Sequence, residues 1–140
     1  MIRLLSMAAA ALMMFLALAP AEATERQPIH QLRIYDIFDA NKAAFHERFR
    51  DHGLPIMKRH GFTVLAMWET RKDDRPQLVY LLQWPDEATM QARWKSFLAD
   101  PEWIEIKRVT GARHGRMVGE IESRVLTTLP YSPSLEHSGI

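Results

Sequence analysis

The first strong pattern in the chain is an alternation of apolar and polar side chains over His30–Phe38. Leu32 and Ile34 alternate with Arg33 and Tyr35, which is the period of a strand with one buried face. We expect the first strand here, with the aliphatic pair packed on helices. Arg33 and Tyr35 then point to the open face of the sheet, because successive side chains of a strand face opposite sides.

A helical pattern follows this strand. It runs from Asp39, a candidate cap, to Gly61, at a position where helices commonly end in the left-handed conformation. Its apolar positions are Ala43, Ala44, Phe45, Phe49 and Ile56. Pro55 removes one backbone donor inside the helix, so we expect a kink or a restart at Gly53–Pro55.

The middle of the chain has the pattern of a β-hairpin. Thr63–Thr70 and Gln77–Trp84 are rich in β-forming residues, and a charged turn over Arg71–Pro76 joins them. We expect two antiparallel strands here.

A helix interrupted by Asp-Pro follows the hairpin. Asp86 is its expected cap, and Asp100 is a second cap that precedes Pro101 at a first helical position. We expect the restarted helix to change direction, with Trp103 fixing the angle by burying ~150 to 250 Å². The helix before the restart carries an apolar stripe of Met90, Trp94, Phe97 and Leu98. The helix after the restart carries Ile106 and Thr110 on the same side as Trp103.

A last extended run, Glu120–Leu129, completes the order β-α-β-β-α-β with an extra helix before the final strand. This order predicts an α+β protein of the ferredoxin-like class.

The N-terminus has the layout of a secretory signal peptide. Arg3 precedes an apolar stretch, and Ala21 and Ala23 form an A-x-A cleavage site. The apolar stretch is short for the alternative, an uncleaved membrane anchor. We therefore expect residues 1–23 to be removed and a periplasmic or secreted protein to begin at Thr24, with no stable membrane anchor.

Composition narrows the function classes. The chain has no cysteine, so disulfides and thiolate metal or redox sites are excluded. Its 18 Lys+Arg and 17 Asp+Glu are interspersed and give a net charge of +1, which lacks the basic footprint of a nucleic-acid-binding protein. We expect one domain over residues 24–133 and a tail over residues 134–140.

Several short stretches carry a family resemblance: Leu32–Tyr35, Pro55–Gly61, Trp68–Thr70, Asp100–Trp103 and Leu129–Pro133. In this order and spacing they resemble the NIPSNAP domain of the dimeric α/β-barrel superfamily. The resemblance implies a ferredoxin-like protomer that pairs sheet to sheet into a barrel. It implies little chemistry, because this superfamily includes cofactor-free monooxygenases and haem-degrading enzymes.

The predicted open sheet face is the first candidate site. Arg33 and Tyr35 share it with Tyr80, Leu82 and Trp84 if the strands alternate as expected. Arg33, Tyr35, Tyr80 and Trp84 are then candidate ligand-binding residues in an aromatic barrel interior. The alternative is a face sealed by a partner subunit.

The same face predicts a homodimer. Tyr35, Ile37, Leu82 and Trp84 would form an exposed apolar patch larger than a monomer usually tolerates. Pairing two such faces would cover both patches.

The histidines offer little catalytic chemistry. His46-Glu47 begins an H-E-x-x-H motif, but Arg50 stands at the second histidine position, so we expect no metal site. His60 suits a helix C-terminus. His52, at the predicted kink, is a candidate catalytic residue together with Tyr35, or else a structural histidine.

Two function classes remain. One is a homodimeric binding or accessory protein that holds a small, partly apolar molecule. The other is a cofactor-independent monooxygenase or isomerase that uses Tyr35, Arg33 and His52. Arg33 itself has two possible roles: it pairs with Glu69, or it binds an anionic or carbonyl group beside Tyr35 and Tyr80. We expect no cofactor in either class.

Overall fold

The computed structural model describes residues 27–135. The predicted signal peptide, residues 1–23, lies outside them, as does most of the predicted tail. The elements are β1 (Ile29–Ile37), α1 (Lys42–Arg48), α2 (Leu54–Arg59), β2 (Thr63–Lys72), β3 (Arg75–Trp84), α3 (Glu87–Leu98), α4 (Pro101–His114) and β4 (Val118–Thr127). No helix of the described residues is long and apolar enough to cross a membrane.

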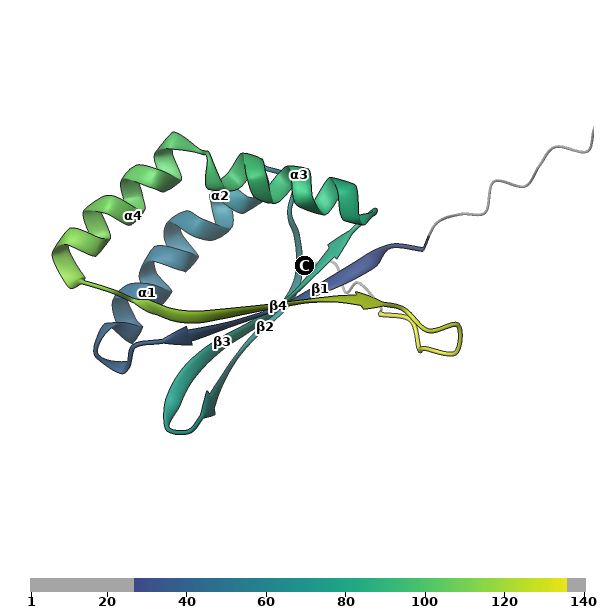
Figure 1. The fold of residues 1–140 in the computed structure, drawn as a ribbon, viewed down its shortest axis with the longest axis horizontal. Helices are drawn as coiled ribbons and strands as arrows, with labels where there is room; N and C mark the ends of the chain where they lie inside the picture. The colour runs from purple at the N-terminus through teal and green to yellow at the C-terminus, as the bar shows by residue number, and fades with distance from the viewer. Residues whose placement is uncertain (1–26, 136–140) are drawn as a thin grey trace, which may run out of the picture.

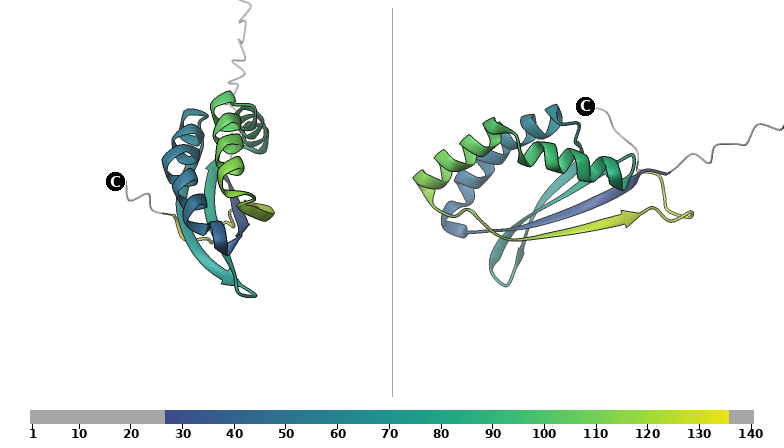
Figure 2. Two further views of the ribbon diagram at one scale, coloured as in Figure 1. Left: turned by 90° about the vertical axis from the view of Figure 1, so that its left-hand side faces the viewer. Right: turned by 45° about the horizontal axis from the view of Figure 1, so that its top comes forward.

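The four strands form one antiparallel sheet in the order β2-β3-β1-β4. The helices form a second layer on one face of this sheet (Figures 1 and 2). This arrangement confirms the predicted ferredoxin-like βαββαβ fold with an extra helix before the last strand. The last strand begins two residues earlier than Glu120, the expected first residue.

The assignment of the two sheet faces was wrong. Ile37 is 0% exposed in the core, and Tyr35 packs against Phe45 of α1 at a ring distance of 6.5 Å. The odd-numbered residues of β1 therefore face the helices. Leu32 and Ile34 lie on the open face, where they are half-buried. Aliphatic character alone did not decide the buried face, because Arg33 and Tyr35 are covered by aromatic side chains of the helices.

The face residues of β3 follow the same correction. Tyr80, Leu82 and Trp84 do share the face of Arg33 and Tyr35, as predicted, but this face is the core of the protomer. The apolar patch predicted from them is therefore not exposed.

Two local predictions also differ from the structure. Asp39 does not cap α1, since its carboxylate accepts a hydrogen bond from Arg71 Nη2 at 3.0 Å instead. The turn of the hairpin is shorter than expected and consists of Asp73 and Asp74, both with positive φ, 49° and 61°. This conformation matches the twist of two-residue hairpins, so pairing continues to Lys72 and Arg75.

The first helix is interrupted where Pro55 predicted it. A π-helical turn over Phe49–Gly53 separates α1 from α2. α2 ends at Arg59, and Gly61, which follows its C-cap residue His60, has the expected left-handed conformation with φ of 78°. The interruption places Gly53 beside α4: a Cβ atom added to Gly53 would lie 3.5 Å from Trp103 Cη2.

The Asp-Pro restart is organised around Asp100 and Trp103. Asp100 Oδ1 accepts hydrogen bonds from the backbone N–H groups of Glu102 and Trp103 at 2.9 and 3.1 Å. The Trp103 ring is 7% exposed and stacks on Phe97 of α3 with 5.3 Å between ring centroids. Trp103 thus joins α3 to α4, as the sequence predicted, and it also contacts the π-helical turn at Gly53.

A second contact holds the same junction. Asp100 Oδ2 accepts a hydrogen bond from Arg59 Nη2 at 2.9 Å and lies 2.7 Å from His60 Nε2. The hydrogen bonds from His60 and Arg59 lower the pKa of Asp100 well below its usual range. The end of α2 is therefore tied to the start of α4 by an ionised carboxylate.

Replacing Trp103 should destabilise the protein strongly. We expect Trp103→Ala to lower the free energy of unfolding by about 3 to 5 kcal/mol, because it leaves a cavity between three elements. Ile104→Ala is the matched control: Ile104 is 49% exposed, so its loss should cost at most about 0.5 kcal/mol. Urea unfolding measures both, and equal costs would refute the role given to Trp103.

Because of the Asp100 contacts, the free energy of unfolding should depend on pH in the acid range. Because the pKa of Asp100 is lowered in the folded state, its contribution is complete above the usual carboxyl pKa of about 4 and is lost as the pH falls further. Asp100→Asn keeps the cap but cannot carry the charge. Its free energy of unfolding should fall less steeply below about pH 4 than that of the wild type. Parallel curves in urea titrations would contradict this.

Candidate functional site

A cavity of about 370 Å³ lies between the sheet and the helices. Its floor comes from β1 and β4, and its walls come from all four helices and the π-helical turn. The lining side chains are mostly aromatic or aliphatic, with three cations; the set is Arg33, Tyr35, Phe45, Arg48, Phe49, Met57, Trp94, Phe97, Leu98, Trp103, Lys107, Val118 and Ile121.

Aromatic rings hold the shape of this cavity. Tyr35 meets Phe49 edge to face at 6.4 Å, and Phe49 stacks on Phe45 at 5.7 Å. On the other side, Trp94 meets Phe97 edge to face at 5.8 Å, and Phe97 stacks on Trp103. Such contacts give a preformed apolar space for a small molecule.

Arg33 is the polar group at the floor of the cavity. Its guanidinium carbon lies 4.4 Å from the centroid of the Trp94 ring, and Nη2 donates to the Tyr35 hydroxyl at 3.1 Å. Arg33 Nε is buried and has no hydrogen-bond partner among the described residues. None of the ion pairs within residues 27–135 includes Arg33. The cation is therefore held by aromatic rings rather than by a carboxylate.

Tyr80 is a hydrogen-bond partner of Tyr35. The Tyr80 hydroxyl donates to the Tyr35 hydroxyl at 2.8 Å, and Tyr80 is 0% exposed. Burial raises the pKa of Tyr80, so its phenol stays protonated. With hydrogen bonds from both Arg33 and Tyr80, the Tyr35 oxygen acts as the acceptor twice. Its own O–H is then left to donate toward the cavity.

Two further cations stand at the edge of the cavity. Arg48 Nη1 donates to Thr110 Oγ1 at 3.1 Å, and burial lowers the pKa of Arg48. Lys107 Nζ lies 5.8 Å from the centroid of the Trp103 ring. No aspartate or glutamate is among the described lining residues, so the charged side chains that line the cavity are all cations.

The predicted site residues divide into two groups. Arg33 and Tyr35 line the cavity, and Tyr80 lies directly behind Tyr35. Trp84 is 1% exposed and donates to Gln31 Oε1 at 3.1 Å, so it is a core residue outside the cavity wall. The pairing of Arg33 with Glu69 was wrong, because Glu69 pairs with Lys42 and His46.

His52 lies apart from Arg33 and Tyr35. It is exposed and lines a shallow groove between the first helix and α4, together with Glu47 and Glu105. The structure therefore does not bring His52 into the cavity. His60 contacts Asp100 and is close to its expected structural role at the helix end.

Sequence reasoning missed most of the cavity wall. Trp94 and Trp103 were assigned to the core, and Arg48 and Lys107 were not considered. The spacing of Trp103 and Lys107, one helical turn apart, was the available signal, because residues at i and i+4 share a helix face.

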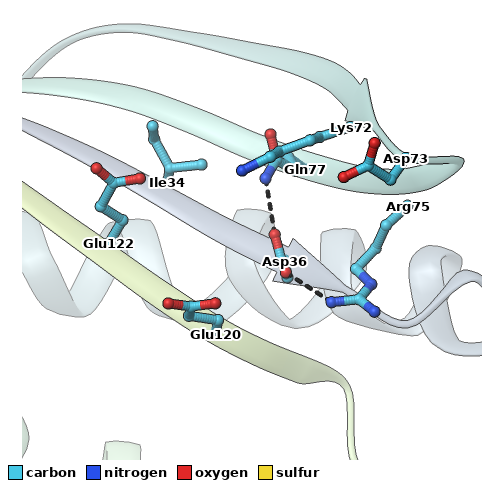
Figure 3. Close-up of a pocket in the computed structure, with 8 residues that line it drawn as sticks. All are labelled: Ile34, Asp36, Lys72, Asp73, Arg75, Gln77, Glu120 and Glu122. Atoms are coloured by element: carbon cyan, nitrogen blue, oxygen red, sulfur yellow. Dashed lines mark hydrogen bonds and ion pairs between the residues drawn. The ribbon is translucent and has the colours of Figure 1, made fainter.

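A second hollow lies on the open sheet face, near the β2–β3 turn (Figure 3). Asp36 accepts hydrogen bonds there from Arg75 Nη1 at 2.9 Å and Gln77 Nε2 at 2.7 Å. Charges of both signs surround it, including Glu120 and Lys72. No group of three or more His, Asp or Glu side chains that could hold a metal ion occurs in residues 27–135.

The fold and the cavity define a ferredoxin-like α+β protein with an apolar, positively charged site between sheet and helices. Residues 30–133 match the NIPSNAP family model, and the chain belongs to the NIPSNAP family. This confirms the resemblance seen in the sequence. No curated protein matches the chain significantly.

Solved structures share the fold at low sequence identity. A NIPSNAP-like domain protein from Burkholderia xenovorans has 23% identity and a TM-score of 0.66, with 79% of this chain and 93% of that chain covered. A NIPSNAP family protein from Agrobacterium tumefaciens has 17% identity and a TM-score of 0.66, with coverages of 76% and 98%. A putative antibiotic biosynthesis monooxygenase from Nitrosomonas europaea has 11% identity and a TM-score of 0.51, with coverages of 76% and 94%.

Removing Arg33 should not destabilise the fold. Arg33→Met eliminates a half-buried cation that has no carboxylate partner, and a methionine can still pack on Trp94. We expect a free energy of unfolding within about 1 kcal/mol of the wild type, or higher. A loss of several kcal/mol in urea unfolding would show that Arg33 is structural.

Proposed function

We propose that this NIPSNAP-family protein is an exported homodimer that binds a small, partly apolar molecule in the cavity between sheet and helices. The observation that carries the proposal is the cavity itself. Its volume of about 370 Å³ and its mainly apolar wall with a few polar groups are typical of small-molecule sites.

Export is supported by the N-terminal sequence. The basic residue, apolar stretch and Ala21-Glu22-Ala23 have the order of a secretory signal peptide. We propose that the mature protein begins at Thr24 in the periplasm or outside the cell.

The homodimer is supported by the open face of the sheet. The strand register groups apolar side chains on this face. Leu32 of β1 lies opposite Leu81 of β3, and Val79 of β3 lies between Ile34 of β1 and Trp68 of β2. Trp68 is 52% exposed. Charged residues, Asp36 and Arg75 among them, lie next to Ile34 near the β2–β3 turn. A second copy would cover it in a two-fold interface.

Catalysis is the weaker candidate. A cofactor-independent monooxygenase or isomerase needs a group that takes a proton from its substrate. In the described part of the cavity wall no histidine or carboxylate occupies that position, and His52 lies in a different groove. Tyr35 is the tyrosine among the described lining residues, and its hydroxyl oxygen already accepts two hydrogen bonds.

Blocking the cavity should abolish binding. Ile121 lines the cavity and is 46% exposed, so Ile121→Trp should fill the space without disturbing the core. Val125 is equally exposed on the same strand and the same face but does not line the cavity. We expect calorimetry with 2-naphthoate and 2-naphthamide to show binding to the wild type and to Val125→Trp, and at least tenfold weaker binding to Ile121→Trp. No binding of either probe, or no difference between the variants, would contradict the proposal.

Charge on the open face should separate the subunits. We expect light scattering to give a dimer mass for the wild type and a monomer mass for Trp68→Glu, because the substitution puts a carboxylate into the proposed interface. Val109→Glu, at a 40% exposed position on α4, is the control and should stay dimeric. A monomeric wild type at micromolar concentration would contradict the homodimer.

A further inference from the structure

We propose that the molecule bound in the cavity is an apolar anion, and that its carboxylate or similar planar oxyanion is bound by the Arg33 guanidinium and the Tyr35 hydroxyl. This inference rests on the proposed binding function and names the class of ligand. The apolar body would lie against the aromatic wall formed by Phe49, Phe97 and Trp103.

Arg33 provides unused donors at the floor of the cavity. A guanidinium carries five N–H groups: Arg33 Nη2 donates to Tyr35, the Tyr80 hydroxyl also interacts with the guanidinium, and the buried Nε has no partner. A buried donor without a partner is costly, because it has lost its hydrogen bonds to water. Trp94 covers one side of the guanidinium and cannot accept these hydrogen bonds as a carboxylate would. A bound oxyanion would contact Arg33, which lines the cavity, and would supply the countercharge that no carboxylate of residues 27–135 provides.

Tyr35 adds a third donor beside the guanidinium. Tyr80 is completely buried, and Tyr35 is its hydrogen-bond partner, so the Tyr80 proton is directed to the Tyr35 oxygen. Arg33 donates to the same oxygen. The Tyr35 O–H therefore has no role within this network and is free for an acceptor in the cavity.

The rest of the wall favours the same charge. Arg48 and Lys107 add two cations at its edge, and none of the described lining residues is acidic. This bias does not come from composition, because the net charge of the whole chain is only +1. It comes from the positions of three cations around one apolar space. A ligand amine would meet repulsion there, and a neutral ligand would leave Arg33 without a countercharge.

The shape of the donors points to a planar monoanion. The N–H groups of a guanidinium lie in one plane and match the two oxygens of a carboxylate. The aromatic rings leave room for a body of one or two rings in a cavity of about 370 Å³. An aromatic or short aliphatic carboxylic acid fits both requirements.

The test compares 2-naphthoate with its neutral isostere 2-naphthamide by calorimetry at neutral pH. We expect the wild type to bind the carboxylate at least tenfold more tightly than the amide. Arg33→Met should bind the carboxylate no more tightly than the amide, with its amide affinity unchanged. Tyr35→Phe should reduce the preference several-fold. Arg50→Met is the matched control: Arg50 is exposed, pairs with Asp51 and lies outside the cavity wall, so the preference should persist.

The possible failures are distinguishable. Equal affinity of the wild type for the two probes, or a preference that survives Arg33→Met, would overturn the anion assignment and leave the binding cavity intact. Binding of neither probe would overturn the proposed function and the anion assignment together.

Discussion

The Arg33 guanidinium lies on the helix-covered face of the sheet, with its carbon 4.4 Å from the centroid of the Trp94 ring. Removing a cation from water costs free energy that some other contact must offset. No carboxylate of residues 27–135 pairs with it, so the offset comes from aromatic rings and from the Tyr35 and Tyr80 oxygens. These contacts satisfy the cation only in part, since Nε remains unpaired. The polarity of the cavity floor follows from this one constraint.

The cavity exists because two helical stretches are interrupted. The π-helical turn before Pro55 and the Asp100-Pro101 restart both change the helix path over the sheet. Trp103 packs at their junction against Phe97 and beside Gly53. Straight helices would close over the sheet more evenly, whereas these leave a space bordered by rings. Stability and binding therefore depend on the same aromatic residues.

The sequence was sufficient for the element order and for the grouping of side chains into faces. Alternation correctly placed Arg33, Tyr35, Tyr80 and Trp84 together, and the Asp100 cap and the Gly61 helix end were predicted at the right residues. Alternation does not show which of the two faces is buried, however. Because Arg33 is charged, its face was assigned to the open side of the sheet, and that assignment was wrong. The contact that buries Arg33 comes from Trp94, which is distant in sequence and was visible only in the fold.

The same limit explains the errors at the site. Glu69 was the nearest plausible carboxylate by strand alternation, yet Lys42 and His46 of α1 pair with it. His52 was placed by its position at the kink, and the π-helical turn directs it to the groove between α1 and α4 instead of the cavity. Both errors concern which helix residue faces which strand residue, and local periodicity does not determine that.

The two faces of the sheet have separate roles in this account. The helix-covered face holds the proposed ligand cavity, and the open face, with Trp68 exposed, is the proposed dimer surface. A crystal structure of the protein soaked with 2-naphthoate tests the central claim most directly. The account predicts carboxylate oxygens within about 3 Å of Arg33 and of the Tyr35 hydroxyl, with the rings inside the cavity. A naphthoate bound on the open sheet face, or one inside the cavity with its carboxylate turned away from Arg33, would contradict it.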